Sequence, residues 1–294
     1  MLPQPFLRWA GGKRRLASLI TSIFPAELDL KASRYFEPFV GGGALAFYLG
    51  DRNSPYFIPG SRTYLSDSNP DLIAAYQILR DDLPSLIKEL KRISKRLDLN
   101  EYEKIRSYSP KDKVQKAARF IYLNKTCFNG LWRVNNKGQF NVPWGKLQNP
   151  RIFDEEIFRV NSERLRGSKI SLKDFQTQLK KTKKGDLVYL DPPYIPLSPS
   201  SSFSKYSKND FGLEDQLKLR DTIRDLTQKG VYIILSNSDT NLTREIFGND
   251  LELYHLNVNR SIAAKASSRN QVMEIIGINY SLSNLENITA LKRI

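Results

Sequence analysis

The chain has 294 residues, of which 40% are hydrophobic and 11% aromatic, so it can fold around a substantial core. One cysteine excludes a disulfide framework, and no apolar run in the sequence approaches the length that spans a bilayer. Lys and Arg number 46 against 31 Asp and Glu, and the net charge of +15 favours a polyanionic partner over a merely solvated surface. The N-terminus lacks the layout of a signal peptide, so we expect a cytoplasmic protein.

Short apolar runs alternate with helical patterns along most of the chain, which is typical of an α/β fold with a largely parallel sheet. Asp186–Leu190 is almost wholly apolar, as expected of a strand that is covered on both faces. In chain order, the predicted strands are Arg34–Pro38, Thr63–Ser66, Lys169–Leu172, Asp186–Leu190, Val231–Ser236, Leu251–Val258 and Glu274–Tyr280.

The pattern changes between the second and third of these strands. Apolar spacing predicts three helices there, over Leu72–Arg80, Leu83–Leu97 and Lys113–Leu123. A loop-rich stretch, Asn124–Pro150, follows them. We therefore predict that residues 72–165 form a mainly helical domain, inserted into a sheet domain made of residues 1–71 and 166–294.

A block of unusual composition, Phe6–Lys13, lies close to the N-terminus. Chain ends are usually frayed, so a Trp, paired glycines and a Lys are unlikely to gather there by chance. Gly11 and Gly12 open a helix beside Lys13, which suits a pocket for a carboxylate. Trp9 fits either this pocket or the hydrophobic core.

A second block, Phe36–Leu45, runs from a strand through three glycines into a helix. Glycines let the backbone turn sharply and approach a ligand closely. Asp67 ends the next strand, where an acidic side chain can bind ribose hydroxyls. NAD and S-adenosylmethionine both carry a ribose, so these residues by themselves leave both cofactors open.

The strongest chemical pattern is Asp191-Pro192-Pro193-Tyr194, directly after a predicted strand, where an open parallel sheet binds ligands. An exocyclic amine is a poor nucleophile because its lone pair is delocalised into the ring. The Asp191 carboxylate and a backbone carbonyl can accept its two hydrogens and draw the nitrogen towards sp³ geometry. Pro192 stiffens this turn and adds no donor, and Tyr194 offers a flat face for stacking an extruded base. The structural alternative is a Pro-Pro turn that Asp191 caps.

In this order and spacing, the three blocks resemble those of the Dam-type DNA adenine-N6 methyltransferases, the alpha group of amino-methyltransferases. The resemblance extends from Phe6 to about Met273. It implies a Rossmann-like methyltransferase sheet with an inserted target-recognition domain, and methyl transfer from S-adenosylmethionine to N6 of a flipped-out adenine in duplex DNA. The catalytic residues that it implies are Asp191, Pro192, Pro193 and Tyr194. The cofactor-binding residues that it implies are Trp9, Lys13, Phe39, Gly41, Gly43, Asp67, Asp174, Phe175 and Asp191.

Two shorter segments also match this family, Ser236–Thr240 (SNSDT) and Arg260–Ile262 (RSI). We expect each of them either to support the pocket for the target base or to have a purely structural role.

The loop-rich stretch combines aromatic, amide and cationic side chains in two segments, Tyr122–Arg133 and Gly138–Lys146. An Arg can hold guanine O6 and N7, a Leu can touch the thymine methyl, and an aromatic ring can fill the space of a flipped base. The resemblance implies a target related to GATC. It assigns Arg8 and Arg133 to guanines, Leu131 to thymine, Phe128 to intercalation, and Asn129 and Lys146 to nearby contacts.

Other methyl-transfer chemistries fit this sequence less well. Cytosine-C5 methylation needs a nucleophilic thiolate, whereas Cys127 follows Thr126 rather than a proline. Cytosine-N4 enzymes tend to have Ser where Asp191 stands, and ribosomal RNA and protein-glutamine methyltransferases more often have Asn. A DNA-binding protein that has lost catalysis would have no need of the intact Asp191–Tyr194 and Gly41–Gly43 blocks.

The expected partner is double-stranded DNA, so we expect a nucleoid-associated protein with no membrane contact. One Cys and one His give no basis for a metal site. The family resemblance admits a cognate restriction endonuclease as a functional partner, with or without a stable complex.

Overall fold

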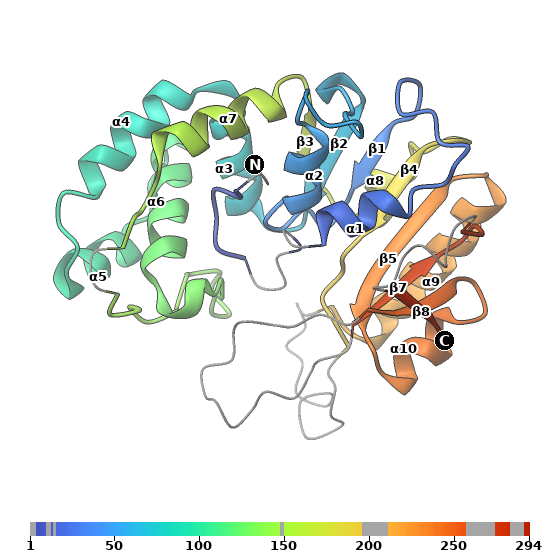
Figure 1. Cartoon of the computed structure of the whole chain (residues 1–294). Helices are drawn as coiled ribbons and strands as arrows, with labels where there is room; N and C mark the ends of the chain where they lie inside the picture. The colour runs from blue at the N-terminus through green and yellow to red at the C-terminus, as the bar shows by residue number, and fades with distance from the viewer. Residues whose placement is uncertain are drawn as a thin grey trace. The chain divides into compact units, whose positions relative to one another are not determined.

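The computed structural model describes residues 4–9, 13, 16–147, 150–195, 211–256, 274–282 and 291–294 (Figure 1). Contacts within the chain divide it into two compact units. Unit 1 comprises residues 1–17 and 40–174, and unit 2 comprises residues 18–39 and 175–294. Gly11, Gly12 and the predicted Arg260–Ile262 segment lie outside the described residues.

The strands form one eight-stranded sheet in the order β3-β2-β1-β4-β5-β7-β6-β8. They are β1 Tyr35–Glu37, β2 Thr63–Asp67, β3 Lys169–Leu172, β4 Leu187–Leu190, β5 Tyr232–Ser238, β6 Glu252–Leu256, β7 Glu274–Ile278 and β8 Leu291–Arg293. The pairs β2/β3, β1/β4 and β4/β5 are parallel, while β7 runs antiparallel to both β5 and β6. The order 3-2-1-4-5 is that of a doubly wound sheet, which confirms the predicted Rossmann-like α/β class.

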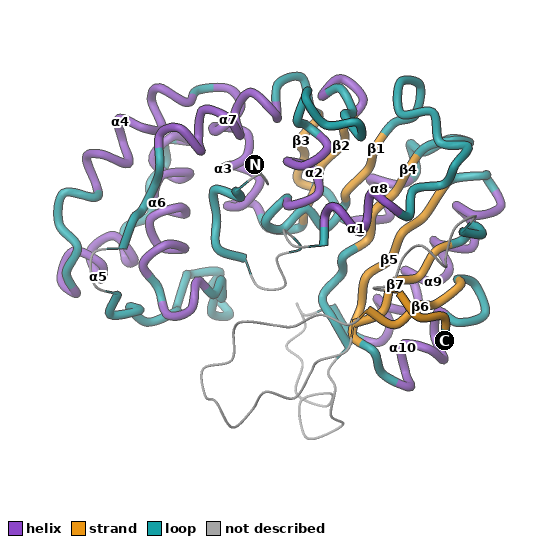
Figure 2. The backbone as a smooth tube through the Cα atoms, viewed as in Figure 1, coloured by secondary structure: helices purple, strands orange, loops and turns teal. Residues whose placement is uncertain are grey.

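Unit 1 contains β2, β3 and most of the helices, and α3 packs against both strands and against α6 (Figure 2). Its helices are α2 Ala44–Leu49, α3 Pro70–Asp81, α4 Leu83–Ile93, α5 Leu99–Ser107, α6 Lys113–Thr126 and α7 Glu155–Leu165. Two 3-10 turns accompany them, η1 Gly60–Arg62 and η2 Phe128–Gly130. From α3 to α7, each α-helix starts at an Asn or Asp whose side chain accepts a first-turn N–H: Asn69, Asp82, Asp98, Asp112 and Asp154.

The three helices predicted in this region are confirmed, with different ends. α4 ends at Ile93 rather than Leu97: Ser94 is its C-cap, and Asp98 already caps the next helix, α5. α5 and α7 were not predicted from the sequence. In α5 only Tyr102 and Ile105 are buried, so the apolar spacing that predicts a helix is weak there.

Unit 2 contains the remaining strands, with α8 Phe175–Leu179, α9 Leu213–Gln228 and α10 Asn241–Phe247. The short α1, Ala17–Ser22, starts at the last residue of the first unit 1 segment. In the sheet, Phe36 aligns with Val188, and Val188 aligns with Ile233, and all three are buried. β8 was not predicted from the sequence; it adds an antiparallel edge strand next to β6.

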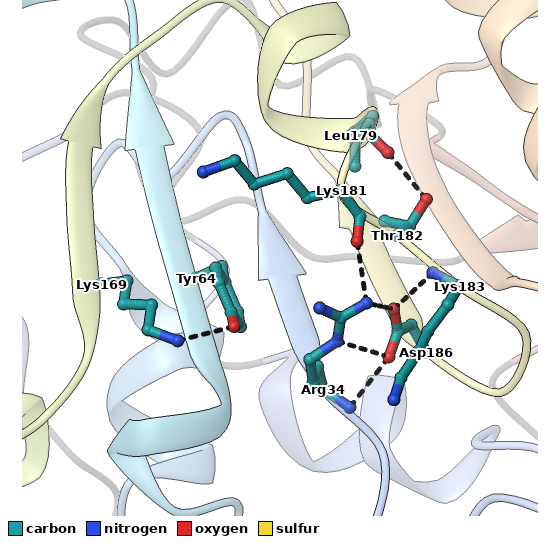
Figure 3. A network of polar contacts seen from close by, with 8 residues as sticks. All are labelled: Arg34, Tyr64, Lys169, Leu179, Lys181, Thr182, Lys183 and Asp186. Carbon is teal, nitrogen blue, oxygen red and sulfur yellow. Dashed lines mark hydrogen bonds and ion pairs between the residues drawn. The ribbon is translucent and has the colours of Figure 1, made fainter.

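Arg34 and Asp186 join the beginnings of the neighbouring strands β1 and β4 (Figure 3). The Asp186 side chain is 1% exposed and accepts from the Arg34 N–H, Nε and Nη2, the last at 2.6 Å. It also accepts from the Lys183 N–H at 2.7 Å, and Arg34 Nη2 donates to the Lys181 carbonyl. The network therefore gives a buried carboxylate a full set of donors, as a buried charge requires.

The same figure includes a separate contact of unit 1, between β2 and β3. Lys169 Nζ donates to Tyr64 Oη at 2.7 Å and lies 4.4 Å from the centre of its ring. The contact reinforces a parallel register in which Leu65 aligns with Ile170 and Asp67 aligns with Leu172.

The division into two units differs from the domain boundaries predicted from the sequence. Unit 1 joins the helical region to β2, β3 and the glycine-rich segment after β1. The assignment of residues 72–165 to target recognition stays a prediction. Among the described helices, none combines the length and the apolar composition that crossing a membrane requires.

Candidate active site and DNA interface

The glycine block of unit 1 forms a tight loop between β1 and α2. Gly41 and Gly43 have φ angles of 46° and 64°, a left-handed conformation that favours glycine. Three hydrogen bonds hold the loop: Val40 N–H donates to the Ser66 carbonyl, Gly43 N–H to the Val40 carbonyl, and Tyr76 Oη to the Gly41 carbonyl. The loop conformation is therefore fixed by contacts with β2 and α3.

Asp67, at the end of β2, lies directly against this loop. Its Oδ2 accepts from the Gly41 N–H at 3.2 Å, and its Oδ1 accepts from the Asn69 N–H at 2.9 Å. Burial raises the pKa of Asp67, and these backbone hydrogen bonds act in the opposite direction. Each carboxylate oxygen has a second lone pair, so Asp67 retains acceptor capacity for ligand hydroxyls.

Trp9 packs on the same glycine loop, also within unit 1. A Cβ added at Gly41 would lie 2.7 Å from the indole Nε1, so no side chain fits at this position. Lys13 is buried. The structure thus brings Trp9, Gly41 and Asp67 together, three of the residues predicted to bind the cofactor.

The predicted pair Asp174 and Phe175 stands at the boundary between the units, with Asp174 ending unit 1. Asp174 is exposed two residues after β3, and the preceding Lys173 N–H donates to the Asp67 carbonyl at 3.2 Å. In unit 2, Phe175 stacks on Phe39 with ring centres 5.5 Å apart.

Phe211, which was not predicted, completes this aromatic cluster of unit 2. Its ring lies edge-on to Phe39 at 5.5 Å and 5.9 Å from the ring of Phe175. Phe211 directly precedes the Gly212 cap of α9 and follows a Ser-rich stretch. No pattern in the sequence connects it to two aromatics so far away along the chain.

Asp191 begins the loop after β4, and Ser236 of β5 orients its carboxylate. Ser236 Oγ donates to Asp191 Oδ1 at 2.7 Å and lies 3.0 Å from the Tyr189 hydroxyl. Because β1 and β4 are parallel neighbours, Phe39 and Asp191 both follow strands at the same edge of the sheet. The strand order reverses between β1 and β4, which is where doubly wound sheets bind their ligands.

The two proline carbonyls of this loop have different surroundings. The Pro193 carbonyl accepts from Gln216 Nε2 of α9 at 2.9 Å. No hydrogen bond to the Pro192 carbonyl occurs among the described residues, and Pro192 itself is buried. The Pro192 carbonyl therefore keeps its acceptor capacity beside the Asp191 carboxylate.

Two buried tyrosines of unit 2, Tyr189 and Tyr194, lie close enough to Asp191 to be affected by its charge. Burial, and then the Asp191 charge, raise the pKa of both Tyr189 and Tyr194 well above the usual value of a phenol. Tyr194 Oη donates to Glu274 Oε2 at 3.3 Å, and Tyr35 Oη donates to Glu37 Oε2 at 2.7 Å. These tyrosines remain neutral donors at physiological pH.

The predicted Ser236–Thr240 segment contacts the loop after β4, Asp191–Ile195, through consecutive side chains. Besides the Ser236 contact, Asn237 Oδ1 accepts from the Ile195 N–H at 3.2 Å, and Ser238 Oγ donates to the Ile195 carbonyl. Asn237 and Ser238 are buried. The segment therefore connects β5 to both ends of the Asp191–Ile195 loop, and a role at the pocket for the target base stays a prediction.

The predicted DNA-binding segment of unit 1 forms an irregular hairpin after α6. Isolated antiparallel bridges pair Cys127 with Trp144 and Val134 with Phe140. At the tip, Asn135 and Gln139 are linked by main-chain and side-chain hydrogen bonds. The Trp132 ring packs between Phe120 and Phe140, with ring centres 4.3 and 4.5 Å away, so the hairpin is anchored on α6.

The residues predicted to touch DNA are exposed on this hairpin and on the N-terminal segment. They are Arg8, Phe128, Asn129, Leu131, Arg133 and Lys146. The Phe128 and Leu131 side chains are large and apolar yet 49% and 43% exposed. Among the described residues, only Asn129 and Lys146 combine a side chain with a left-handed φ, at 53° and 51°. Such strained backbone often marks functional loops.

Lys125 lies near the residues predicted to touch DNA, but no role was predicted for it from the sequence. It lies in the last turn of α6, and burial, followed by repulsion from Arg8, lowers its pKa to about 8. In a basic protein, a cation in such a position is easily taken for a solvated charge. Only the structure shows that it is half-buried close to Arg8.

Comparison with known proteins gives consistent matches. The family model described as "D12 class N6 adenine-specific DNA methyltransferase" matches residues 9–262. The chain is 38% identical over 285 residues to the type II methyltransferase M1.LlaDCHI of Lactococcus lactis subsp. cremoris, covering 94% of this chain and 95% of that protein. It is 38% identical over 294 residues to the type II methyltransferase M.MjaIII of Methanocaldococcus jannaschii, covering 94% and 99%. It is 35% identical over 281 residues to the DNA adenine methylase of Haemophilus influenzae, covering 94% and 93%.

Proposed function

Because the chain belongs to the D12 class of N6 adenine-specific DNA methyltransferases, we propose that it transfers a methyl group from S-adenosylmethionine to N6 of an adenine flipped out of duplex DNA. The observation that carries this proposal is the Asp191 carboxylate, oriented by Ser236 next to the Pro192 carbonyl, which accepts no hydrogen bond from the described part of the chain. Two acceptors at the end of β4 match the two hydrogens of an exocyclic amine.

The residues around the glycine loop fit the proposed cofactor. Gly41 and Gly43 give the loop its left-handed turns and let Trp9 and Tyr76 pack closely on it, and Asp67 offers carboxylate oxygens for ribose hydroxyls. Trp9 provides an indole face beside them. We assign binding roles also to Lys13, Phe39, Asp174 and Phe175. When bound, S-adenosylmethionine supplies an electrophilic sulfonium methyl group.

Asp191 and the Pro192 carbonyl hold the amino group so that its nitrogen lone pair points at this methyl group. As the new N–C bond forms, the bond between the methyl group and sulfur would break and leave a neutral thioether. The Asp191 carboxylate would stabilise the positive charge that develops on the nitrogen, which then loses one proton to solvent. Tyr194 offers its ring for stacking the flipped base, and Pro193 shapes the turn through its contact with Gln216. Positioning thus contributes much of the rate enhancement.

The hairpin and the N-terminal segment of unit 1 provide the DNA contacts of this proposal. Arg8 and Arg133 present guanidinium groups that can pair with guanine, and Leu131 can contact a thymine methyl. Phe128 can fill the gap that a flipped base leaves. We propose a target related to GATC, with Asn129 and Lys146 making neighbouring contacts.

Arg133→Ala is expected to lower discrimination at one guanine of the target by about 1–3 kcal/mol, because a bidentate contact is lost there. Asn141 Oδ1 accepts from Arg133 Nε at 2.8 Å, so the guanidinium is already oriented in the free protein. Methylation rates on duplexes altered at single positions give the measurement. The matched control is Lys137→Ala at the hairpin tip, which should preserve discrimination. A loss shared equally by all duplexes would make Arg133 a phosphate contact.

DNA affinity is expected to fall as the pH rises from 7 to 9. Part of this loss of affinity should come from deprotonation of Lys125. Its pKa of about 8 in the free protein means that the ammonium loses its proton in this range. A DNA phosphate stabilises the charged form, so binding above pH 8 requires proton uptake and becomes weaker. Fluorescence anisotropy at constant ionic strength measures the effect. Lys125→Arg, which stays charged, should remove this component, and an unchanged pH profile in that variant would contradict the role.

Single-molecule sequencing of plasmid DNA from cells that express the protein tests the proposed function directly. We expect N6-methyladenine at one short motif, and none of it with the Asp191→Ala variant. Methylated cytosine, or no modified base from a folded protein, would overturn the proposal. The action on genomic DNA places the protein at the nucleoid, and a cognate restriction endonuclease is the functional partner suggested by the type II relatives.

A further inference from the structure

A single buried side chain, Asn124, contacts both segments of unit 1 to which we assign DNA contacts. It lies in the last turn of α6 and has no exposed surface. Its Oδ1 accepts from the Arg8 N–H at 2.8 Å, while Nδ2 donates to the Arg8 carbonyl at 2.7 Å and to the Gly130 carbonyl at 3.2 Å. Because a carboxamide has two N–H donors, both are in use.

The backbone of the hairpin also touches Arg8 directly. Gly130 has a φ of 65°, and a Cβ added there would lie 2.7 Å from the Arg8 Cβ. A side chain at this position would therefore push the two segments apart. Arg8 is therefore held by two kinds of contact: the Asn124 hydrogen bonds to its backbone and the close packing of Gly130 on its Cβ.

The Asn124 hydrogen bonds hold main-chain atoms of Arg8 and Gly130. They do not involve the side chains that we propose to contact bases. Arg8, Phe128 and Leu131 are exposed. Among the described residues, none forms an ion pair or hydrogen bond with the Arg8 guanidinium. The arrangement holds Arg8 as though it were part of the hairpin, although the two are more than a hundred residues apart in sequence.

We propose that Asn124 is a positioning residue for target discrimination, which sets Arg8 in register with the Phe128–Arg133 turn so that both contact one DNA site. This inference rests on the proposed DNA role of Arg8. A segment so close to the N-terminus is prone to fraying unless it is held. Hydrogen bonds to base edges weaken steeply with misalignment. Loss of the Asn124 hydrogen bonds should therefore weaken contacts to the bases of the target more than contacts to the phosphate backbone.

The test compares Asn124→Ala and Arg8→Ala on a cognate duplex and on duplexes altered at single base pairs. We expect Asn124→Ala to reduce discrimination about tenfold at the same position as Arg8→Ala, and the double variant to add little to either change. The matched control is Asn161→Ala. Asn161 is a buried Asn of α7 whose Nδ2 donates to the Gln4 carbonyl at 2.8 Å, so it holds the same segment without touching the hairpin.

The outcomes separate this inference from the proposed function. If Arg8→Ala changes discrimination and Asn124→Ala does not, or if Asn161→Ala has the same effect as Asn124→Ala, the positioning role is wrong. If Arg8→Ala itself leaves discrimination unchanged, the DNA role of Arg8 falls, and this inference falls with it.

Two further variants keep the test valid if Asn124→Ala does not fold. Asn124→Asp retains the acceptor for the Arg8 N–H but loses both donors, and Gly130→Ala presses on the Arg8 Cβ. Both should repeat the discrimination pattern of Arg8→Ala. A uniform loss of rate on every duplex, with unchanged ratios, would contradict the proposal.

Discussion

Asp191→Ala should lower the rate of methyl transfer by about 10²- to 10³-fold and leave the affinity for DNA nearly unchanged. The carboxylate is the one charged group that the proposed reaction places on the attacking amine, and removing a pre-oriented group of this kind commonly costs two to three orders of magnitude. Single-turnover transfer of a labelled methyl group to duplex DNA measures the effect, and anisotropy measures binding.

Ser236→Ala provides a graded comparison for that variant. Its hydroxyl donates to Asp191 Oδ1, so the variant keeps the carboxylate but loses the contact that orients it. We expect a loss of about tenfold, well short of the Asp191→Ala effect. Activity of Asp191→Ala within tenfold of the wild type would show that another group holds the amine.

Asp186→Ala is expected to destabilise the fold by about 3 kcal/mol, because it leaves the Arg34 guanidinium and the Lys183 N–H without the acceptor that both now share. Arg34 retains some exposure, 20% of its side chain, so the loss should lie near the lower end of the range for broken buried pairs. Urea denaturation followed by tryptophan fluorescence and by circular dichroism measures the change.

Asp221→Ala is the matched control for this change in stability. Asp221 pairs with Arg220 on the exposed surface of α9, and exposed pairs contribute little to stability. Its denaturation midpoint should therefore match that of the wild type. Equal midpoints for Asp186→Ala and Asp221→Ala would mean that the Arg34–Asp186 network does not stabilise the sheet.

Much of the fold was predictable from local patterns. The strand Leu187–Leu190 is buried along its whole length and was predicted from a nearly all-apolar run, and the helices that begin at Asn69 and Asp112 combine a capping residue with apolar spacing. β8 could not be predicted. It is three residues long with two exposed charged side chains, and it exists because β6 offers an unpaired edge.

The candidate site also contains residues that could be predicted from the sequence and residues that could not. Asp191-Pro192-Pro193-Tyr194 and Gly41–Gly43 were recognisable because their chemistry is carried by adjacent residues. Phe211 and Lys125 were not, because their significance depends on neighbours that are distant in sequence: Phe39 in one case and Arg8 in the other.

By itself, the sequence determined which chemistry this protein can perform, since residue type and local order fix a loop that accepts hydrogen bonds, a glycine turn and a capped helix. Only the tertiary structure showed which distant side chains form hydrogen bonds with these segments and orient them. Ser236 orients Asp191 from a neighbouring strand, and Asn124 holds Arg8 from the end of α6. The physical reason is that such hydrogen bonds depend on the pairing of strands and helices in space, and no local periodicity along the chain encodes a partner 45 or 116 residues away.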